Sequence, residues 1–130
     1  MSRAKTTLRP TQAETSILQV LWQRGPSTVR EVHEVLSAER DMGYTTVLKL
    51  LQIMHDKGLV RRDESQRSHR YQAVSTQRRT QQQLVADLLD RAFGGSMRNL
   101  VMHALSSRKA SSAELAEIRT LLDELEAKQR

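Results

Sequence analysis

Residues 43–62, GYTTVLKLLQIMHDKGLVRR, hold the pattern that decides the fold. Apolar side chains recur three or four residues apart, which predicts a helix over residues 45–57 that ends at Gly58. The face expected to be buried consists of Val47, Leu50, Leu51 and Met54. The opposite face carries hydroxyl, ammonium and amide groups, those of Thr45, Thr46, Lys49 and Gln52. Such groups either face water or contact a polar partner.

A period-two pattern follows this helix. Residues 59–62 and 69–74 flank the polar stretch 63–68, which predicts a two-stranded hairpin with a charged tip. Because two strands alone are marginally stable in water, the hairpin must pack against helices.

Two capping boxes predict two further helices nearer the N-terminus. The boxes are Thr11 with Glu14 and Thr28 with Glu31. The first helix ends at Gly25-Pro26, and a glycine-containing turn at residues 41–43 separates the second from the third. Three short helices followed by a hairpin are the order of a winged helix–turn–helix. In that motif the recognition helix enters the DNA major groove, and the hairpin, or wing, reaches across the backbone.

Positive charge concentrates around the hairpin. The chain has 21 Lys and Arg against 15 Asp and Glu, a net +6, and residues 57–79 alone hold seven bases against two acids, a net +5. DNA phosphates attract such a segment, so we expect double-stranded DNA as the partner. Contacts with bases or adjacent phosphates are assigned to Tyr44, Thr45, Thr46, Lys49 and Gln52. Backbone contacts are assigned to Arg9, Arg30, Arg61, Arg62, Arg67 and Arg70, with His69 when it is protonated.

Two alternatives stay open from the residues alone. The polar face of the third helix could simply be solvated, as on most amphipathic helices. A winged helix can also mediate protein contacts, in which case the charged hairpin would serve an acidic protein partner.

The last part of the chain is helical again. Apolar stripes predict three helices, and the boundary is placed so that residues 1–75 form the DNA-binding domain and residues 76–130 a helical dimerisation domain. The apolar side chains of these three C-terminal helices are few for a stand-alone domain but adequate for a core shared by two chains. A small independent three-helix bundle is the alternative. Dimer contacts are assigned to Leu84, Leu88, Phe93, Met97, Leu100, Val101, Leu105, Leu115, Ile118, Leu121, Leu122 and Leu125.

Composition excludes several other classes. The chain has no cysteine, which excludes disulfides, thiolate zinc sites and cysteine nucleophiles. The four histidines show no metal-ligand spacing, and no nucleophile–base pair or phosphate loop occurs, so we expect no enzyme, no metal and no cofactor. No apolar run suits a membrane helix or a signal peptide, so we expect a soluble, cytoplasmic protein that does not insert into membranes.

Several segments together resemble the penicillinase-repressor family (BlaI/MecI, with the copper-responsive CopY repressors). The resemblance covers about residues 8–125. The segments that carry it are LQVLW (18–22), TVREVHE (28–34), GYTTVL (43–48), LLQ (50–52), KGLV (57–60), RSHRY (67–71) and FGGS (93–96). It implies a mainly α protein with a small β-hairpin. The N-terminal winged helix would bind a dyad-symmetric operator, and intertwined C-terminal helices would hold a homodimer. It also implies a membrane-bound sensor peptidase whose activation releases the repressor.

Three features depart from the family pattern. Staphylococcal members are cut at an Asn-Phe pair, whereas the matching stretch 100–105 reads LVMHAL, so the resemblance does not carry that cleavage position over. The copper-responsive branch uses C-terminal cysteines, and their absence here argues against copper sensing. Lys49 stands where relatives commonly have Thr, so a different operator sequence is expected.

Overall fold

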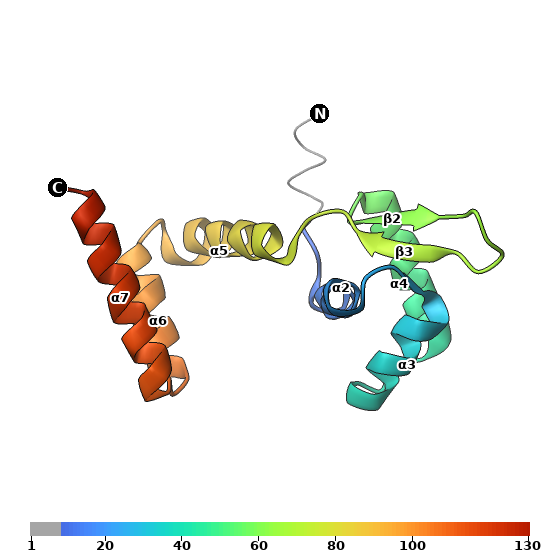
Figure 1. The fold of residues 1–130 in the computed structure, drawn as a ribbon, viewed down its shortest axis with the longest axis horizontal. Coiled ribbons are helices and arrows are strands. Elements are labelled where there is room, and N and C mark those ends of the chain that lie inside the picture. Colours follow the sequence, from blue (N-terminus) through green and yellow to red (C-terminus); the bar gives the residue numbers. More distant parts are fainter. Residues whose placement is uncertain (1–8) are drawn as a thin grey trace. The chain divides into compact units, whose positions relative to one another are not determined.

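The computed structural model describes residues 9–130 (Figure 1). The chain divides into two compact units, the first ending at Val85 and the second spanning Ala86–Arg130. The division falls within helix α5 (Gln77–Phe93), which contributes to both units.

The first unit contains three short helices and a small antiparallel sheet. The helices are α2 (Gln12–Arg24), α3 (Val29–Glu39) and α4 (Tyr44–Lys57), and the strands are β1 (Ser27–Thr28), β2 (Val60–Asp63) and β3 (Arg70–Ala73). The strand order is β1-β3-β2, with β3 in the centre. Strands β2 and β3 form the predicted hairpin, and their connecting loop extends beyond the helices (Figure 1). This order of elements is that of a winged helix–turn–helix.

Local sequence signals account for the helix ends. Both predicted capping boxes are confirmed: in each, the Thr hydroxyl accepts from the Glu amide at 3.2 Å, and the Glu carboxylate accepts from the Thr amide at 2.9 Å. Helix α4 ends at Gly58, whose φ of +83° lies in the left-handed region that favours glycine. The predicted bounds of the third helix therefore agree with the structure to within one residue.

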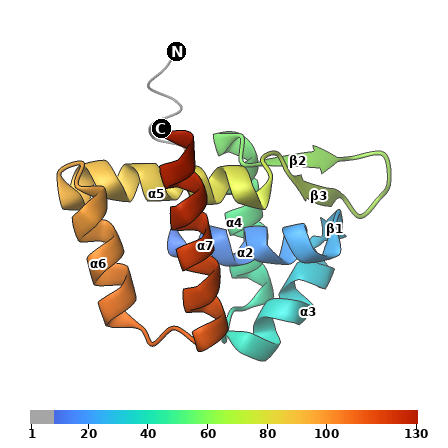
Figure 2. The same ribbon diagram turned by 60° about the vertical axis from the view of Figure 1, so that its left-hand side comes forward.

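The sheet contains the predicted hairpin and one strand that the sequence did not predict. The two-residue strand β1, labelled in Figure 2, pairs with β3. Its register aligns Ser27 with Tyr71 and Thr28 with Arg70. A strand of two residues has no period to detect, and its partners lie more than 40 positions away, so no local pattern indicated it.

The hydrophobic core of the first unit lies between the helices and the sheet. Its fully buried side chains include Ile17, Val32, Leu36, Val47, Leu51 and Met54. Val60 and Tyr71 extend this core onto the hairpin, as the packing argument for two strands requires. Leu50, expected on the buried face of α4, is half-buried. The Trp22 indole Nε1 donates to the Ser75 carbonyl at 2.9 Å and ties α2 to the segment after β3.

The second unit contains helices α6 (Met97–Ser107) and α7 (Ser112–Lys128) after the end of α5. A third capping box, Ser111 with Glu114, opens α7. The chain reverses direction between α6 and α7, so the two helices lie roughly antiparallel (Figure 2). Neither contains a buried residue. Within α6 and α7 of the single chain there is therefore no buried residue around which a bundle core could form.

Candidate nucleic-acid interface

Helix α4 carries the first half of the candidate site. Val47, Leu51 and Met54 have no exposed surface and fix the orientation of the helix in the core. The side chains assigned to base contacts are all exposed on α4, namely Tyr44, Thr45, Thr46, Lys49 and Gln52. Within residues 9–130, Lys49 has no ion-pair partner, so its ammonium is available to an external acceptor.

The N-terminal end of α4 is suited to an anion. Gly43 is its N-cap and supplies no side-chain hydrogen bond, and the first turn contains no acidic residue. A side chain therefore does not occupy the amides that the first turn leaves free, and the helix dipole adds partial positive charge there. Free amides with this polarity are a common binding site for phosphate.

An aromatic contact holds Tyr44 at this end of the helix. The His33 ring from α3 meets the Tyr44 ring edge to face, with centroids 5.8 Å apart and planes at 79°. His33 is half-buried, whereas Tyr44 is 48% exposed. The sequence offered no signal for this pair, because the two residues belong to different helices.

The wing carries the second half of the candidate site. Arg61, Arg67 and His69 are exposed on its strand and loop positions. Neither Arg61 nor Arg67 has a side-chain partner among residues 9–130, so both guanidinium groups can reach phosphates.

The other two wing arginines have partners within the protein. Arg62 is half-buried, and its Nε contacts Glu64 Oε2 at 2.6 Å. The Arg62 pKa is raised above its usual value, mainly by a hydrogen bond with the Tyr71 side chain and next by the one with Glu64. Arg70 pairs with Glu31 of α3 at 3.4 Å. The structure thus separates the four arginines, which the sequence had treated as equivalent, into two free and two paired.

Glu31 brings together three segments of the first unit. Its Oε1 accepts from the Thr28 amide at 2.9 Å and from Arg70 Nη1 at 3.4 Å. Its Oε2 lies 3.5 Å from Nη2 of Arg24, in the last turn of α2. The Glu31 pKa is lowered, mainly by the backbone hydrogen bond from Thr28 and further by the charges of Arg70 and Arg24. Sequence reasoning assigned Glu31 only to the cap and left Arg24 out of the site.

The two remaining assigned arginines lie near helix starts. Arg30 is exposed in the first turn of α3. Arg9 is half-buried at the beginning of the described chain.

The residues assigned to dimer contacts are accessible in the single chain. Leu84, Phe93, Leu100 and Ile118 are half-buried. The more exposed ones are Leu88, Met97, Val101, Leu105, Leu115, Leu121, Leu122 and Leu125, with exposed fractions from 36% at Leu115 to 64% at Met97. Exposed apolar side chains in this number indicate a surface that a partner covers.

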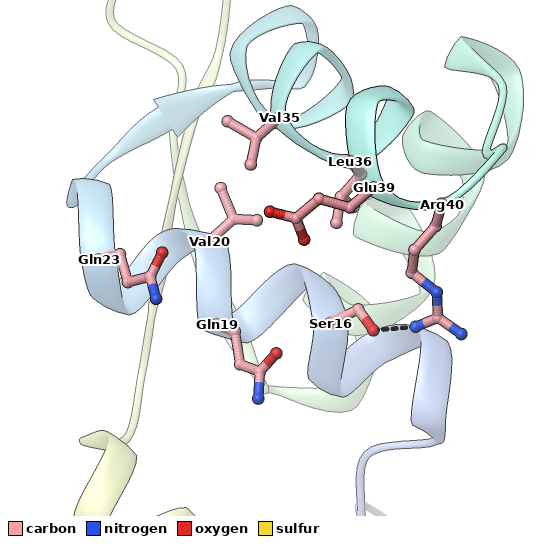
Figure 3. Close-up of a pocket in the computed structure, with 8 residues that line it drawn as sticks. All are labelled: Ser16, Gln19, Val20, Gln23, Val35, Leu36, Glu39 and Arg40. Atoms are coloured by element: carbon pink, nitrogen blue, oxygen red, sulfur yellow. Dashed lines mark hydrogen bonds between the residues drawn. The ribbon is translucent and has the colours of Figure 1, made fainter.

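A groove of about 290 Å³ lies between α2 and α3 (Figure 3). Val20, Val35 and Leu36 supply its apolar part. Arg40 Nη1 donates to the Ser16 hydroxyl between the two helices. The groove is not part of the α4 and wing surface described above.

Among residues 9–130, no three His, Asp or Glu side chains gather in a group that could hold a metal ion. No helix in that range has the length and apolar character needed to cross a membrane.

Comparison with known proteins identifies the family. The family model of the penicillinase repressor matches residues 10–124. The transcriptional regulator BlaI of Mycobacterium tuberculosis is 39% identical over 116 residues, covering 88% of this chain and 83% of that protein. The penicillinase repressor of Staphylococcus aureus is 18% identical, covering 89% and 92%.

A solved structure agrees on the fold. The crystal structure of a MarR family transcription regulator matches with a TM-score of 0.53 and 22% identity, covering 98% of this chain and 78% of that one. At this identity the likeness concerns the fold alone. The match of the family model and the identity to BlaI establish more: the chain belongs to the penicillinase repressor family, which consists of transcriptional regulators and not of enzymes.

Proposed function

We propose that the chain is a sequence-specific DNA-binding repressor that acts as a homodimer on a dyad-symmetric operator. The observation that carries this proposal is the exposed polar face of α4, whose N-terminal end is free of a side-chain cap. The free wing arginines, Arg61 and Arg67, supply charge for the backbone.

Each half of the proposed interface has its own task. Thr45, Lys49 and Gln52 present donors and acceptors of the kind that read base edges in the major groove. The wing and the first turn of α3 hold phosphates and so set the register of α4 on the duplex. DNA as the target places the protein in the cytoplasm.

The second unit supports the dimer. Its helices leave apolar stripes uncovered, and two copies can bury these stripes against each other. Two linked winged helices then bind two half-sites about one helical turn apart, or a multiple of that distance.

We also propose that a membrane-bound sensor peptidase, once activated, causes the release of the repressor from DNA. The family likeness supports it, and the stretch 100–105, LVMHAL, leaves the position of any cut undefined. An adjacent gene for a multi-pass membrane peptidase would support this circuit.

A footprint on the DNA flanking its own gene tests the proposal directly. Two protected half-sites related by a dyad are the expected result, and a footprint without dyad symmetry contradicts the dimer. Arg67→Glu combined with Arg70→Glu should abolish specific duplex binding, and retention of that binding contradicts the role of the wing.

The alternative is a winged-helix module that binds an acidic protein. Salt separates the two functions, because DNA binding through several phosphates weakens by orders of magnitude between about 50 and 200 mM salt. Weak salt dependence together with capture of an acidic protein would favour the alternative.

A further inference from the structure

Glu31 occupies an unusual position for an acid beside a proposed DNA surface. A carboxylate repels phosphates, yet this one lies in the first turn of α3, next to Arg30 and at the same end as the strand pair Thr28–Arg70. Its hydrogen bond in the cap does not require the charge, because Gln also occurs at the third position of a capping box.

The carboxylate gathers two arginines from distant segments. Arg24 comes from the end of α2 and Arg70 from the central strand of the sheet, and each contacts a different oxygen of Glu31. The backbone of Arg70 is fixed on both sides, by Thr28 of β1 and by Asp63 of β2. Glu31 therefore lies where it can orient both guanidinium groups.

Stability is a poor reason for this arrangement. The side chains of Arg24 and Arg70 are 44% and 43% exposed, and that of Glu31 is 32% exposed. Ion pairs this accessible to water contribute little to folding. The same exposure leaves the guanidinium groups accessible to an external anion.

The arginines keep donors to spare. A guanidinium has five N–H donors in a planar fork, and Glu31 engages one nitrogen of each arginine. The remaining donors can form charge-assisted hydrogen bonds with phosphate oxygens while the carboxylate holds the other side of each fork.

We propose that Glu31 is a positioning residue that holds Arg24 and Arg70 as a paired contact for the phosphodiester backbone of DNA. Arg24 is thereby a further backbone contact. This inference rests on the proposed function and names additional residues of the same site.

The test uses the full chain and a random-sequence duplex of about three helical turns, because phosphate contacts do not depend on base sequence. Glu31→Gln keeps the capping box and removes the charge that orients the arginines. The matched control is Glu34→Gln on the same helix, because within residues 9–130 the Glu34 carboxylate is exposed and has no side-chain partner.

A simple charge effect and the positioning role predict opposite changes in the duplex affinity of Glu31→Gln. Charge alone predicts that both Gln variants bind the duplex more tightly than the unchanged protein. Positioning predicts that Glu31→Gln binds the duplex several-fold more weakly. It also predicts that the slope of log K against log salt becomes shallower by about 0.9 for each lost phosphate contact, and therefore by up to about 2 if both arginines lose their contacts. Arg24→Gln and Arg70→Gln should each lose about 0.9. In the Arg24→Gln/Arg70→Gln protein, adding Glu31→Gln should weaken binding no further.

Several outcomes overturn the inference. Glu31→Gln binding at least as tightly as Glu34→Gln, with an unchanged slope, shows that the carboxylate does not orient the arginines. An unchanged slope for Arg24→Gln removes that contact even if Glu31→Gln fails to fold. If the unchanged protein shows no salt-dependent duplex binding, the proposed function itself fails, and the inference fails with it.

Discussion

A buried ion pair connects the start of α2 with the end of the proposed recognition helix. The Glu14 side chain is 2% exposed, and both of its oxygens accept from Lys57 Nζ, at 2.9 and 3.0 Å. Glu14 also accepts from the Thr11 amide at 2.9 Å. Removing the lysine charge leaves a carboxylate without its counter-charge inside the protein. We therefore expect Lys57→Met to destabilise the first unit more than Glu14→Gln does.

The size of the loss in unfolding free energy depends on which of the two charges remains after the substitution. Breaking a buried pair by removing one partner costs about 3–5 kcal/mol. Because the Lys57 side chain is 25% exposed, water reaches the site, and about 3 kcal/mol is expected for Lys57→Met. Glu14→Gln keeps the cap, and its lysine can turn towards water, so about 1 kcal/mol is expected. The double variant has no charge left at the site and should be more stable than Lys57→Met alone.

The chain supplies its own reporter for this experiment. Trp22 is its single tryptophan, and its indole donates to Ser75 within the first unit, so its fluorescence follows the unfolding of that unit. Urea unfolding of the three variants at one fixed protein concentration gives the free energies. The reasoning is refuted if Glu14→Gln costs as much as Lys57→Met, or if the double variant is the least stable.

Three further predictions concern DNA, acid and assembly. Lys49→Ala should cost about 1–3 kcal/mol on the cognate operator in a binding titration, and an equal small loss on all sequences would make Lys49 a phosphate contact. The pKa values of Glu31 and Asp63 are lowered, mainly by backbone hydrogen bonds from Thr28 and Ser65 respectively. The two carboxylates therefore stabilise the fold above their unfolded-state pKa, and this stabilisation is lost as the pH falls through the lower folded-state pKa. Asp63→Asn lacks one of these carboxylates, so its urea midpoint should fall less steeply in acid than that of the unchanged chain. Leu121→Asp should shift the protein towards monomer in sedimentation, and an unchanged mass would contradict the assigned dimer surface.

Local signals explain why the helices of the first unit were predictable. A capping box needs only four consecutive residues, and Thr11 and Thr28 each open a helix as the pattern predicts. The periodicity of residues 47–54 likewise fixes which side of α4 is buried. Strand β1 was missed because its pairing is long-range, between Ser27 and Tyr71.

The side-chain partners at the site could not be predicted for the same reason. Charge in a sequence tells which residues are cationic but not which acids the fold brings to them. Arg70 and Glu31 are 39 positions apart, and only the sheet register brings them within 3.4 Å. The stripes of the second unit were visible in the sequence, and their assignment to a dimer stays a prediction.

These partners change the charge that the wing region can offer to DNA. The sequence assigns +5 to residues 57–79. Within the fold, Glu14 neutralises Lys57 and Glu31 neutralises Arg70, so the segment and its partners together carry +3. If the whole segment acted as an undifferentiated basic patch, any of its arginines would contribute equally to the salt dependence of binding. The structure instead predicts that Arg61→Gln and Arg67→Gln reduce the salt slope directly, whereas the effect of Arg70 depends on Glu31. The contribution of a basic segment to DNA binding is thus better predicted from which guanidinium groups are unpaired and which are oriented by a carboxylate than from its net charge.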